Sequence, residues 1–247
     1  MAKSNIKGEN KMSTLIAFFL TVNISIIIFL SIVNLLPKYL KFKKSNYSSS
    51  SGNKFLETVF NKGNYGEYLT FSYLEKLDSF NRILTNVYIP KKDGTTTEID
   101  LIMLSPSGIY VLESKNYSGW IFGDEKSKYW TQTLQKSSKN KFFNPIWQNK
   151  AHINALKNVL DIEDHFYISY IVFSERCKIK KIQVESKDVR VVKRNDLLKT
   201  IENDIKYPLR ILDANKLIEI YSYLKQYSNV DESVKRLHIE NLEKRNI

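Results

Sequence analysis

The sequence predicts an α/β fold, in which a mixed β-sheet is flanked by helices and preceded by one transmembrane helix. An uncharged apolar run occupies 13–36, and three strand-like segments follow one another between 82 and 115. Helical and strand-like segments then alternate towards the C-terminus, which is typical of a sheet covered by helices. The 247 residues are enough for one domain or two small ones.

The apolar run at 13–36 is long enough to cross a lipid bilayer as a helix. It exceeds the core of a signal peptide, and no small-residue cleavage site follows it, so we interpret it as an uncleaved anchor. The chain has a single cysteine, Cys177, which is typical of a reducing compartment. This and the lysine distribution predict a single-pass protein of the cell membrane with its C-terminal domain in the cytoplasm. Three lysines precede the run and four follow it more closely: Lys3, Lys7 and Lys11, then Lys38, Lys41, Lys43 and Lys44.

Composition divides the chain into five segments. The serines at 48–51 predict a flexible tether before the folded part, and the basic, amphipathic end of the chain either docks on the domain, binds phosphates or does neither. The predicted segments are an N-terminal tail (1–12), the transmembrane helix (13–36), a basic, serine-rich tether (37–53), a folded domain (54–175) and an α/β extension packed on it (176–247).

The first part of the folded domain reads as a helix and three strands. Gly63 and Gly66 open a helical stretch, which Asp78-Ser79 closes. Arg82–Pro90 is strand-like, and Lys92-Asp93-Gly94 is a hairpin signal. Since two more strand signals follow without a helix between them, we expect an antiparallel meander.

The second part alternates between the two kinds of element. Asn144-Pro145 suits the first turn of a helix, and the β-rich run Tyr167–Phe173 suits a central strand. Trp120 and Trp130 are expected to pack in the core or within the hairpin rather than to stack on bases. The predicted elements are that hairpin over 119–131, a helix from 145, strands at 167–173 and 188–193, a helix from 197 and a helical region from about 213.

An acidic pair followed by a lysine is the strongest chemical signal. Asp100 lies on an apolar strand, on the same face as Ile102 and Leu104, while Glu113 and Lys115 end the next strand after a tight turn at 106–108. Alternation places Glu113 and Lys115 on one face, and the turn brings Asp100 towards them. Carboxylates in apolar surroundings need a cation or hydrogen-bond donors. The pattern therefore indicates a site for a divalent metal and the water it activates.

Other candidates have simpler explanations when taken alone. Glu67 near a helix start is a favourable first-turn charge, and Gln148 and His152, four residues apart, form a polar stripe on one helix face. Neither the three histidines nor Cys177 makes a zinc pattern. The formal net charge of +12 favours a polyanionic partner, either nucleic acid or an anionic membrane surface, over a merely solvated surface.

Taken together, these motifs resemble the nuclease-related domain (NERD) family, over about residues 60–175. The family is itself similar to the PD-(D/E)xK nucleases, so the resemblance implies a restriction-endonuclease-like fold and phosphodiester hydrolysis. The matching residues are Gly63-x-x-Gly66-Glu67, Glu98-Ile99-Asp100, Glu113-Ser114-Lys115-Asn116-Tyr117-Ser118-Gly119, Trp130, Asn144-Pro145 and Gln148.

The resemblance implies a role for each residue. Asp100 and Glu113 coordinate Mg²⁺ or Mn²⁺, and Glu67 contributes directly or through water. Lys115 orients the attacking water or stabilises the charge on the phosphate. The implied roles are catalytic for Glu67, Asp100, Glu113, Lys115 and Gln148, and substrate-binding for Asn116, Tyr117 and His152. For Asn116 and Tyr117 the equally good alternative is a strand end followed by a turn.

Three positions depart from the family pattern. Leu101 stands where many members have histidine, and His152 stands where a tyrosine is expected after Gln148. The centre of E-x-K is Ser114, where an aliphatic residue or threonine is usual. No implied metal ligand is lost. The sequence thus predicts a membrane-anchored, metal-dependent nuclease acting on DNA in preference to RNA. The alternatives are a non-catalytic module that binds nucleic acid or protein at the membrane, and a structural or signalling protein that kept the fold.

Overall fold

The computed structural model describes residues 2–134, 138–208 and 211–245, with the side chains of residues 1–14 and Arg245 outside the description. The chain forms two units, Met1–Ser45 and Asn46–Ile247. The first unit is helix α1 (Ala2–Lys44). Its segment Leu15–Lys44 is long and apolar enough to cross a membrane. The uncharged run identified in the sequence is therefore helical.

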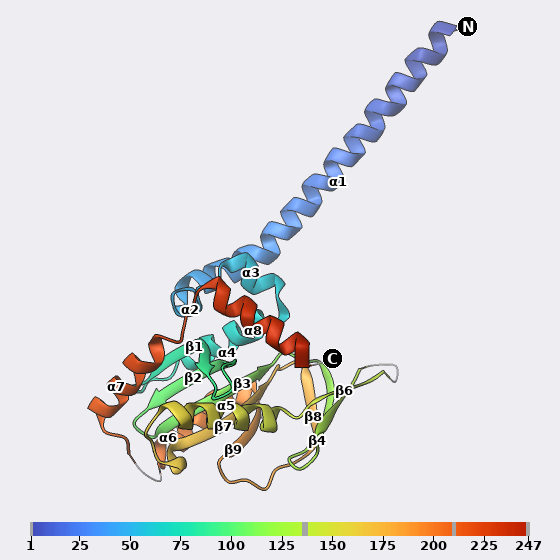
Figure 1. Ribbon diagram of the computed structural model, residues 1–247. Coiled ribbons are helices and arrows are strands. Elements are labelled where there is room, and N and C mark those ends of the chain that lie inside the picture. The colour runs from blue at the N-terminus through green and yellow to red at the C-terminus, as the bar shows by residue number, and fades with distance from the viewer. Residues whose placement is uncertain (1, 135–137, 209–210, 246–247) are drawn as a thin grey trace. The chain divides into compact units, whose positions relative to one another are not determined.

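A five-stranded mixed sheet forms the centre of the second unit (Figure 1). Its order is β1-β2-β3-β7-β9. The first three strands are antiparallel neighbours, which confirms the predicted meander. β7 runs parallel to β3 and lies between it and β9, as predicted for a central strand. The strands are β1 (Arg82–Pro90), β2 (Thr96–Ser105), β3 (Gly108–Lys115), β7 (Tyr167–Phe173) and β9 (Val189–Lys193).

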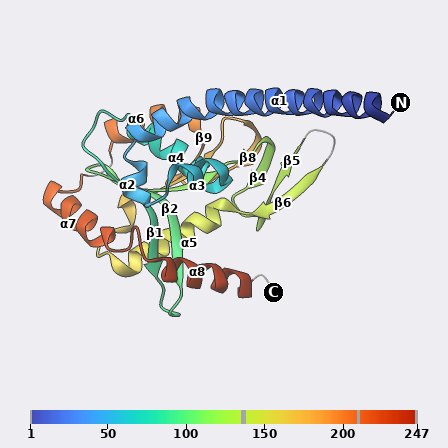
Figure 2. The same ribbon diagram turned by 90° about the horizontal axis from the view of Figure 1, so that it is seen from above.

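Helices cover both faces of this sheet. Figure 2 shows α4 and α6 on one side and α5 on the other. Pro145 begins α5, and the side chain of Asn144 caps it by accepting from the backbone of Ile146, as its sequence predicted. The helices are α2 (Tyr47–Ser51), α3 (Phe55–Phe60), α4 (Lys62–Leu74), α5 (Pro145–Val159), α6 (Leu197–Lys206), α7 (Ala214–Lys225), α8 (Glu232–Arg245) and the short 3₁₀ turns Asp164–Phe166 and Arg194–Asp196.

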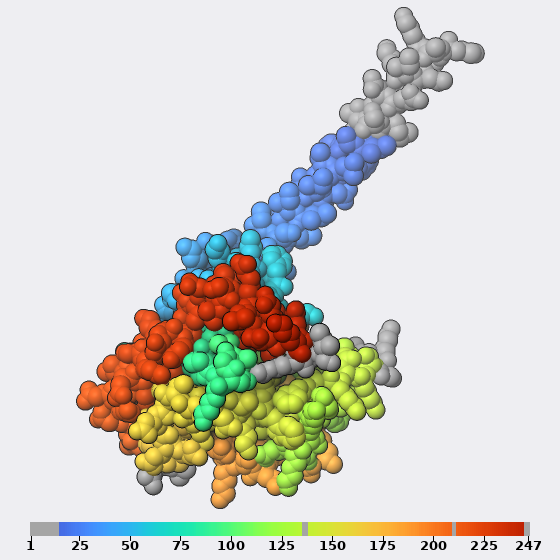
Figure 3. Space-filling model, in the orientation of Figure 1, coloured from blue at the N-terminus to red at the C-terminus, as the bar shows by residue number. Residues whose placement is uncertain are grey.

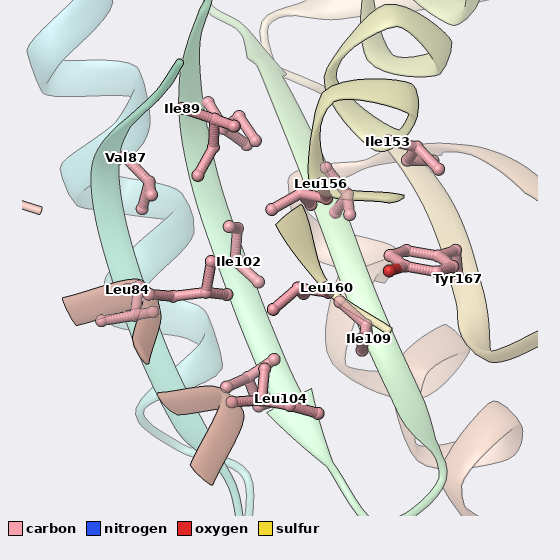
Figure 4. Packing of buried hydrophobic residues seen from close by; sticks show 14 of the residues in the cluster. Leu84, Val87, Ile89, Ile102, Leu104, Ile109, Ile153, Leu156, Leu160 and Tyr167 are labelled. Carbon is pink, nitrogen blue, oxygen red and sulfur yellow. The ribbon is translucent and has the colours of Figure 1, made fainter. Parts of the chain in front are cut away.

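The main core lies between the sheet and helices α5 and α7. Ile102 and Ile109 from β2 and β3 share one cluster with Ile153 and Leu156 from α5 (Figure 4). These strand residues alternate with side chains on the opposite face, where α4 packs. Because both faces are covered, β3 and β7 are buried almost throughout.

A second, four-stranded sheet in the order β6-β5-β4-β8 adjoins the first. The predicted hairpin over 119–131 is confirmed as β4 and β5. Strands β6 and β8 were not predicted, because their lysines interrupt the apolar pattern that indicates a strand. Trp130 is buried on the inner face as predicted, but Trp120 is exposed on the outer face, contrary to prediction. The strands are β4 (Gly119–Asp124), β5 (Tyr129–Thr133), β6 (Lys139–Phe143) and β8 (Cys177–Gln183).

The segments on either side of the predicted domain join it. The serine-rich stretch, predicted as a flexible tether, forms helix α2, and Tyr47 is fully buried beside the rings of Tyr68 and Phe71. Strands β8 and β9, from the predicted extension, complete the two sheets. Helix α8 lies beside the tip of the β1–β2 hairpin (Figure 3). The second unit is thus built from residues on both sides of 54–175.

Candidate active site

Backbone pairing brings the acidic residues of β2 and β3 together. Leu101 pairs with Leu112 and Ile102 with Val111, so the next residues along this register are Asp100 and Glu113. The backbone N–H of Ser114 donates to Asp100 Oδ2 at 2.8 Å. The tight turn therefore places these two carboxylates next to one another, as the sequence predicted.

Glu113 is the buried centre of the site, with 1% of its surface exposed. Its Oε1 lies 2.6 Å from the Lys115 ammonium and its Oε2 lies 3.1 Å from His152 Nε2. Burial opposes ionisation of Glu113, but Lys115 and His152 outweigh it and lower its pKa. Burial likewise disfavours the charge on Lys115, whereas Glu113 and Asp100 raise its pKa. Glu113 and Lys115 are therefore a charged pair.

Helix α5 supplies two side chains from one face, as their spacing predicted. Lys115 donates to Gln148 Oε1 at 3.0 Å. His152 is buried behind Glu113, and its Nδ1 lies 2.9 Å from the hydroxyl of Thr97. Gln148 thus holds the lysine, while His152 holds the glutamate. The polar stripe on this face of α5 therefore contacts Lys115 and Glu113 and forms one side of the site.

Glu67 belongs to a second set of contacts, from α4 and β1. Asn86 Nδ2 lies 3.4 Å from Glu67 Oε2 and 3.2 Å from Glu98 Oε1, so it bridges the two carboxylates. Asn86 has a left-handed backbone with φ of 49°, which asparagine tolerates better than most residues. Tyr88 donates to Glu98 at 2.6 Å. Asn86 and Tyr88 were not predicted as site residues, although asparagine is rare inside strands and its presence in one indicates an irregular position.

The carboxylates repel one another in this half-buried cluster. Burial and the neighbouring Glu98 raise the pKa of Glu67 to about 8, although the hydrogen bond from Asn86 opposes the shift. Burial, Glu113 and Glu67 raise the pKa of Asp100 well above its ordinary range, against the opposing effect of Lys115. Such clustering is typical of catalytic and metal-binding sites. Within the described residues, however, no group of three or more His, Cys, Asp or Glu side chains is arranged to hold a metal ion.

We expect Glu67→Gln to stabilise the metal-free protein increasingly as the pH rises. A carboxyl whose folded pKa lies above its unfolded value binds more protons when folded, so wild-type stability falls between about pH 4.5 and pH 8. Glutamine removes that loss, which solvent screening of the partly exposed carboxyl reduces to about 1–2 kcal/mol, or a few degrees in melting temperature, at pH 8.5. Thermal melts in EDTA from pH 5 to 9 measure the difference. An offset between the two proteins that does not change with pH would contradict the assignment.

The remaining predicted residues support the site from its edges. The Asn116 amide donates to the carbonyl of Lys62 at 2.7 Å, and its oxygen accepts from Arg176 at 2.9 Å. Tyr117 packs edge-on against Phe142, with their ring centroids 4.8 Å apart, in the core of the second sheet. Both side chains thus have structural partners, and their contact with substrate stays a prediction.

Gly66 allows α4 to approach the end of β3 closely. A Cβ on Gly66 would lie 2.8 Å from Asn116 Cβ. We expect Gly66→Ala to destabilise the protein by about 1–3 kcal/mol, even though alanine is the better helix former by about 1 kcal/mol. Urea denaturation measures this effect. A stabilised variant would show that α4 moves away without cost.

The fold and site define an α/β domain of the nuclease-like class, with an acidic cluster and an E-x-K element at the ends of two neighbouring strands. The nuclease-related domain family matches residues 62–174. An uncharacterised protein of Bacillus anthracis is 35% identical over 182 residues, which cover 73% of this chain and 84% of that relative. The chain therefore belongs to the nuclease-related domain family. No solved structure matches it significantly.

Proposed function

We propose that this protein is a membrane-anchored, metal-dependent nuclease that hydrolyses phosphodiester bonds, of DNA in preference to RNA. The juxtaposition of Asp100, Glu113 and Lys115 carries the proposal. Asp100 accepts from the amide of Ser114, between the other two residues, and Lys115 lies 2.6 Å from Glu113. Membership of the nuclease-related domain family supports the same chemistry.

The donor chemistry fits Mg²⁺ or Mn²⁺. These hard cations prefer oxygen ligands, and Mg²⁺ commonly uses one or two carboxylates, with water and substrate phosphate completing its shell. Asp100 and Glu113 would hold the ion, and Glu67 would contribute through water. A bound cation neutralises the carboxylates, polarises a phosphoryl oxygen and acidifies water.

The protein's own side chains would orient the reaction. Lys115 holds its ammonium against Glu113 and Gln148, where it would stabilise the charge on the phosphate or position the attacking water. Gln148 keeps the lysine in place and would contact the substrate or a water. His152 keeps Oε2 of Glu113 occupied, so a bound ion would use Oε1, in competition with Lys115.

The anchor and the charge complete the proposal. Helix α1 would hold the nuclease at the cell membrane, with the C-terminal domain in the cytoplasm. The net charge of +12 would attract a polyanionic substrate, with an affinity that falls steeply with salt.

One observation favours a second candidate, a non-catalytic nucleic-acid-binding module. Both oxygens of Glu113 already have protein partners, Lys115 and His152. If this pairing persists in solution, the carboxylate is not available to a metal ion, and the positive surface would act by binding alone.

A cleavage assay separates the two candidates. The full-length protein in neutral detergent is incubated with labelled duplex DNA, single-stranded DNA and RNA, with Mg²⁺, Mn²⁺ or EDTA, beside Asp100→Ala. Cleavage that requires both metal and Asp100 supports the nuclease. Cleavage undiminished in Asp100→Ala would overturn the assigned site, and salt-sensitive binding without cleavage would favour the binding module.

A further inference from the structure

The outer face of the four-stranded sheet exposes aromatic rings. Residues paired across neighbouring strands point to the same face, and Tyr129 of β5 pairs with Phe143 of β6. The Tyr129 side chain is 51% exposed and the Phe143 side chain is 44% exposed. The centroid of the Phe143 ring lies 6.4 Å from that of Tyr129 and 6.2 Å from that of Trp147. Trp120 on β4, 48% exposed, adds another ring to this face.

The inner face explains the folding of this sheet without those rings. Trp130 and Phe142, one residue along from Tyr129 and Phe143, pack against Phe173 in the core. The outer rings, by contrast, remain exposed to water and bury little surface. Large exposed aromatic side chains gathered on one face mark a binding surface.

Lysines surround the outer rings. Thr131 and Thr133 of β5 pair with Lys141 and Lys139 of β6, on the same face as Tyr129 and Phe143. At the other edge of the sheet, Lys178 of β8 pairs with Trp120. The ammonium of Lys180 lies 4.6 Å from the centre of the Trp120 ring.

Acidic residues are few on these strands. The segments β5, β6 and β8 contain none, and β4 contains only Asp124 at its end. A positively charged face with stackable rings is complementary to a phosphate backbone with accessible bases. We name the outer rings and lysines of this sheet (Trp120, Tyr129 and Phe143 with Lys139, Lys141, Lys178 and Lys180) the aromatic-basic face.

We propose that the aromatic-basic face binds single-stranded nucleic acid, with bases stacked on its rings and phosphates on its lysines. Base–aromatic stacking requires unpaired bases, since a duplex hides the faces of its bases. The inference rests on the proposed function, because it names the form of substrate that reaches the site. The two are close along the chain, because β3 ends at Lys115 and β4, which carries Trp120, begins at Gly119.

Binding of labelled oligonucleotides tests the proposal. The full-length protein in phosphatidylcholine nanodiscs, in EDTA to prevent cleavage, is titrated against oligothymidylate, oligouridylate and a mixed-sequence duplex by fluorescence anisotropy. We expect Trp120→Ala to weaken single-strand binding about tenfold. The matched control is Tyr207→Ala, an exposed ring on another surface with Lys206 at 5.3 Å.

Salt dependence tests the lysines separately. For the double variant Lys139→Gln and Lys141→Gln, the slope of log affinity against log salt should fall by about 1.4, since each phosphate contact to a single strand contributes about 0.7. The control double variant, Lys199→Gln with Lys206→Gln on α6, removes the same charge from another surface. Its slope of log affinity against log salt should stay close to that of wild type.

The outcomes distinguish this inference from the proposed function. Single-strand binding unchanged in both aromatic-basic variants overturns the inference, even where Asp100-dependent cleavage is present. Loss of single-strand binding in those variants alone supports the inference, even where no cleavage is found. If Trp120→Ala instead weakens binding to vesicles containing phosphatidylserine and leaves oligonucleotide binding intact, the face is a membrane contact and the inference is wrong.

Discussion

Replacing Lys115 with methionine is expected to reduce cleavage by about a hundred- to a thousandfold while preserving metal binding. In the proposed reaction the ammonium stabilises charge that develops on the phosphate, and loss of one such group typically costs about a hundred- to a thousandfold in rate. The same change releases Glu113 Oε1 from its 2.6 Å contact with Lys115. The carboxylate then repels Asp100 and has a stronger need for a cation.

Thermal shift measurements separate these two effects. We expect Mg²⁺ or Mn²⁺ to raise the melting temperature of Lys115→Met at least as much as that of wild type, because ligands that bind the folded state stabilise it. Asp100→Asn, which removes a proposed ligand, should lose both cleavage and the metal-dependent shift. Lys115→Met with full activity, or with no metal response although wild type responds, would contradict the assigned roles.

Replacing Glu175 with alanine is expected to destabilise the protein more than replacing its partner Arg194 with methionine. Arg194 is completely buried, and its Nη1 lies 2.6 Å from Glu175 Oε2. Its Nε donates to Thr70, whose hydroxyl lies 3.1 Å from that of Ser114 in the E-x-K segment. Without Glu175 the guanidinium is left as a buried charge, which costs about 3 kcal/mol. The melting temperature should fall by about 6–12 °C.

The variant Arg194→Met is expected to lose less stability. Glu175 is half exposed and can return to water, and methionine occupies much of the volume of Arg194 without a charge. Arg194 Nη2 is already buried without a hydrogen bond, so its removal also relieves one unsatisfied group. Calorimetry of both variants measures the order. A larger loss in Arg194→Met would mean that the links to Thr70 and Ser114 outweigh the charge.

The local parts of the site were predictable because short-range geometry decides them. A tight turn joins β2 and β3, so the alternation of side chains was enough to bring Asp100 beside Glu113 and Lys115. Gln148 and His152 share a helix face because they are four residues apart. In both cases the relevant distance along the chain is short, and strand or helix geometry alone relates the residues.

The contacts that the sequence did not reveal join distant segments. Asn86 reaches Glu67 across 19 positions, and Arg194 reaches Thr70 across 124. The lysine-rich strands β6 and β8 lack the apolar alternation of a typical strand, so their place in the second sheet depends on Trp130 and Phe173 beneath them. The exposure of Trp120 follows from that placement.

The sequence by itself determined the apolar helix, the antiparallel meander and the local pairing of the acidic residues, because periodicity and turn chemistry act over a few residues. Only the tertiary structure decided which helix covers Glu113, how Asn86 bridges Glu67 to Glu98 and which face of the second sheet meets solvent. Those features arise when separate segments pack together, and packing depends on the shape and burial of the whole domain and not on the pattern of any single element.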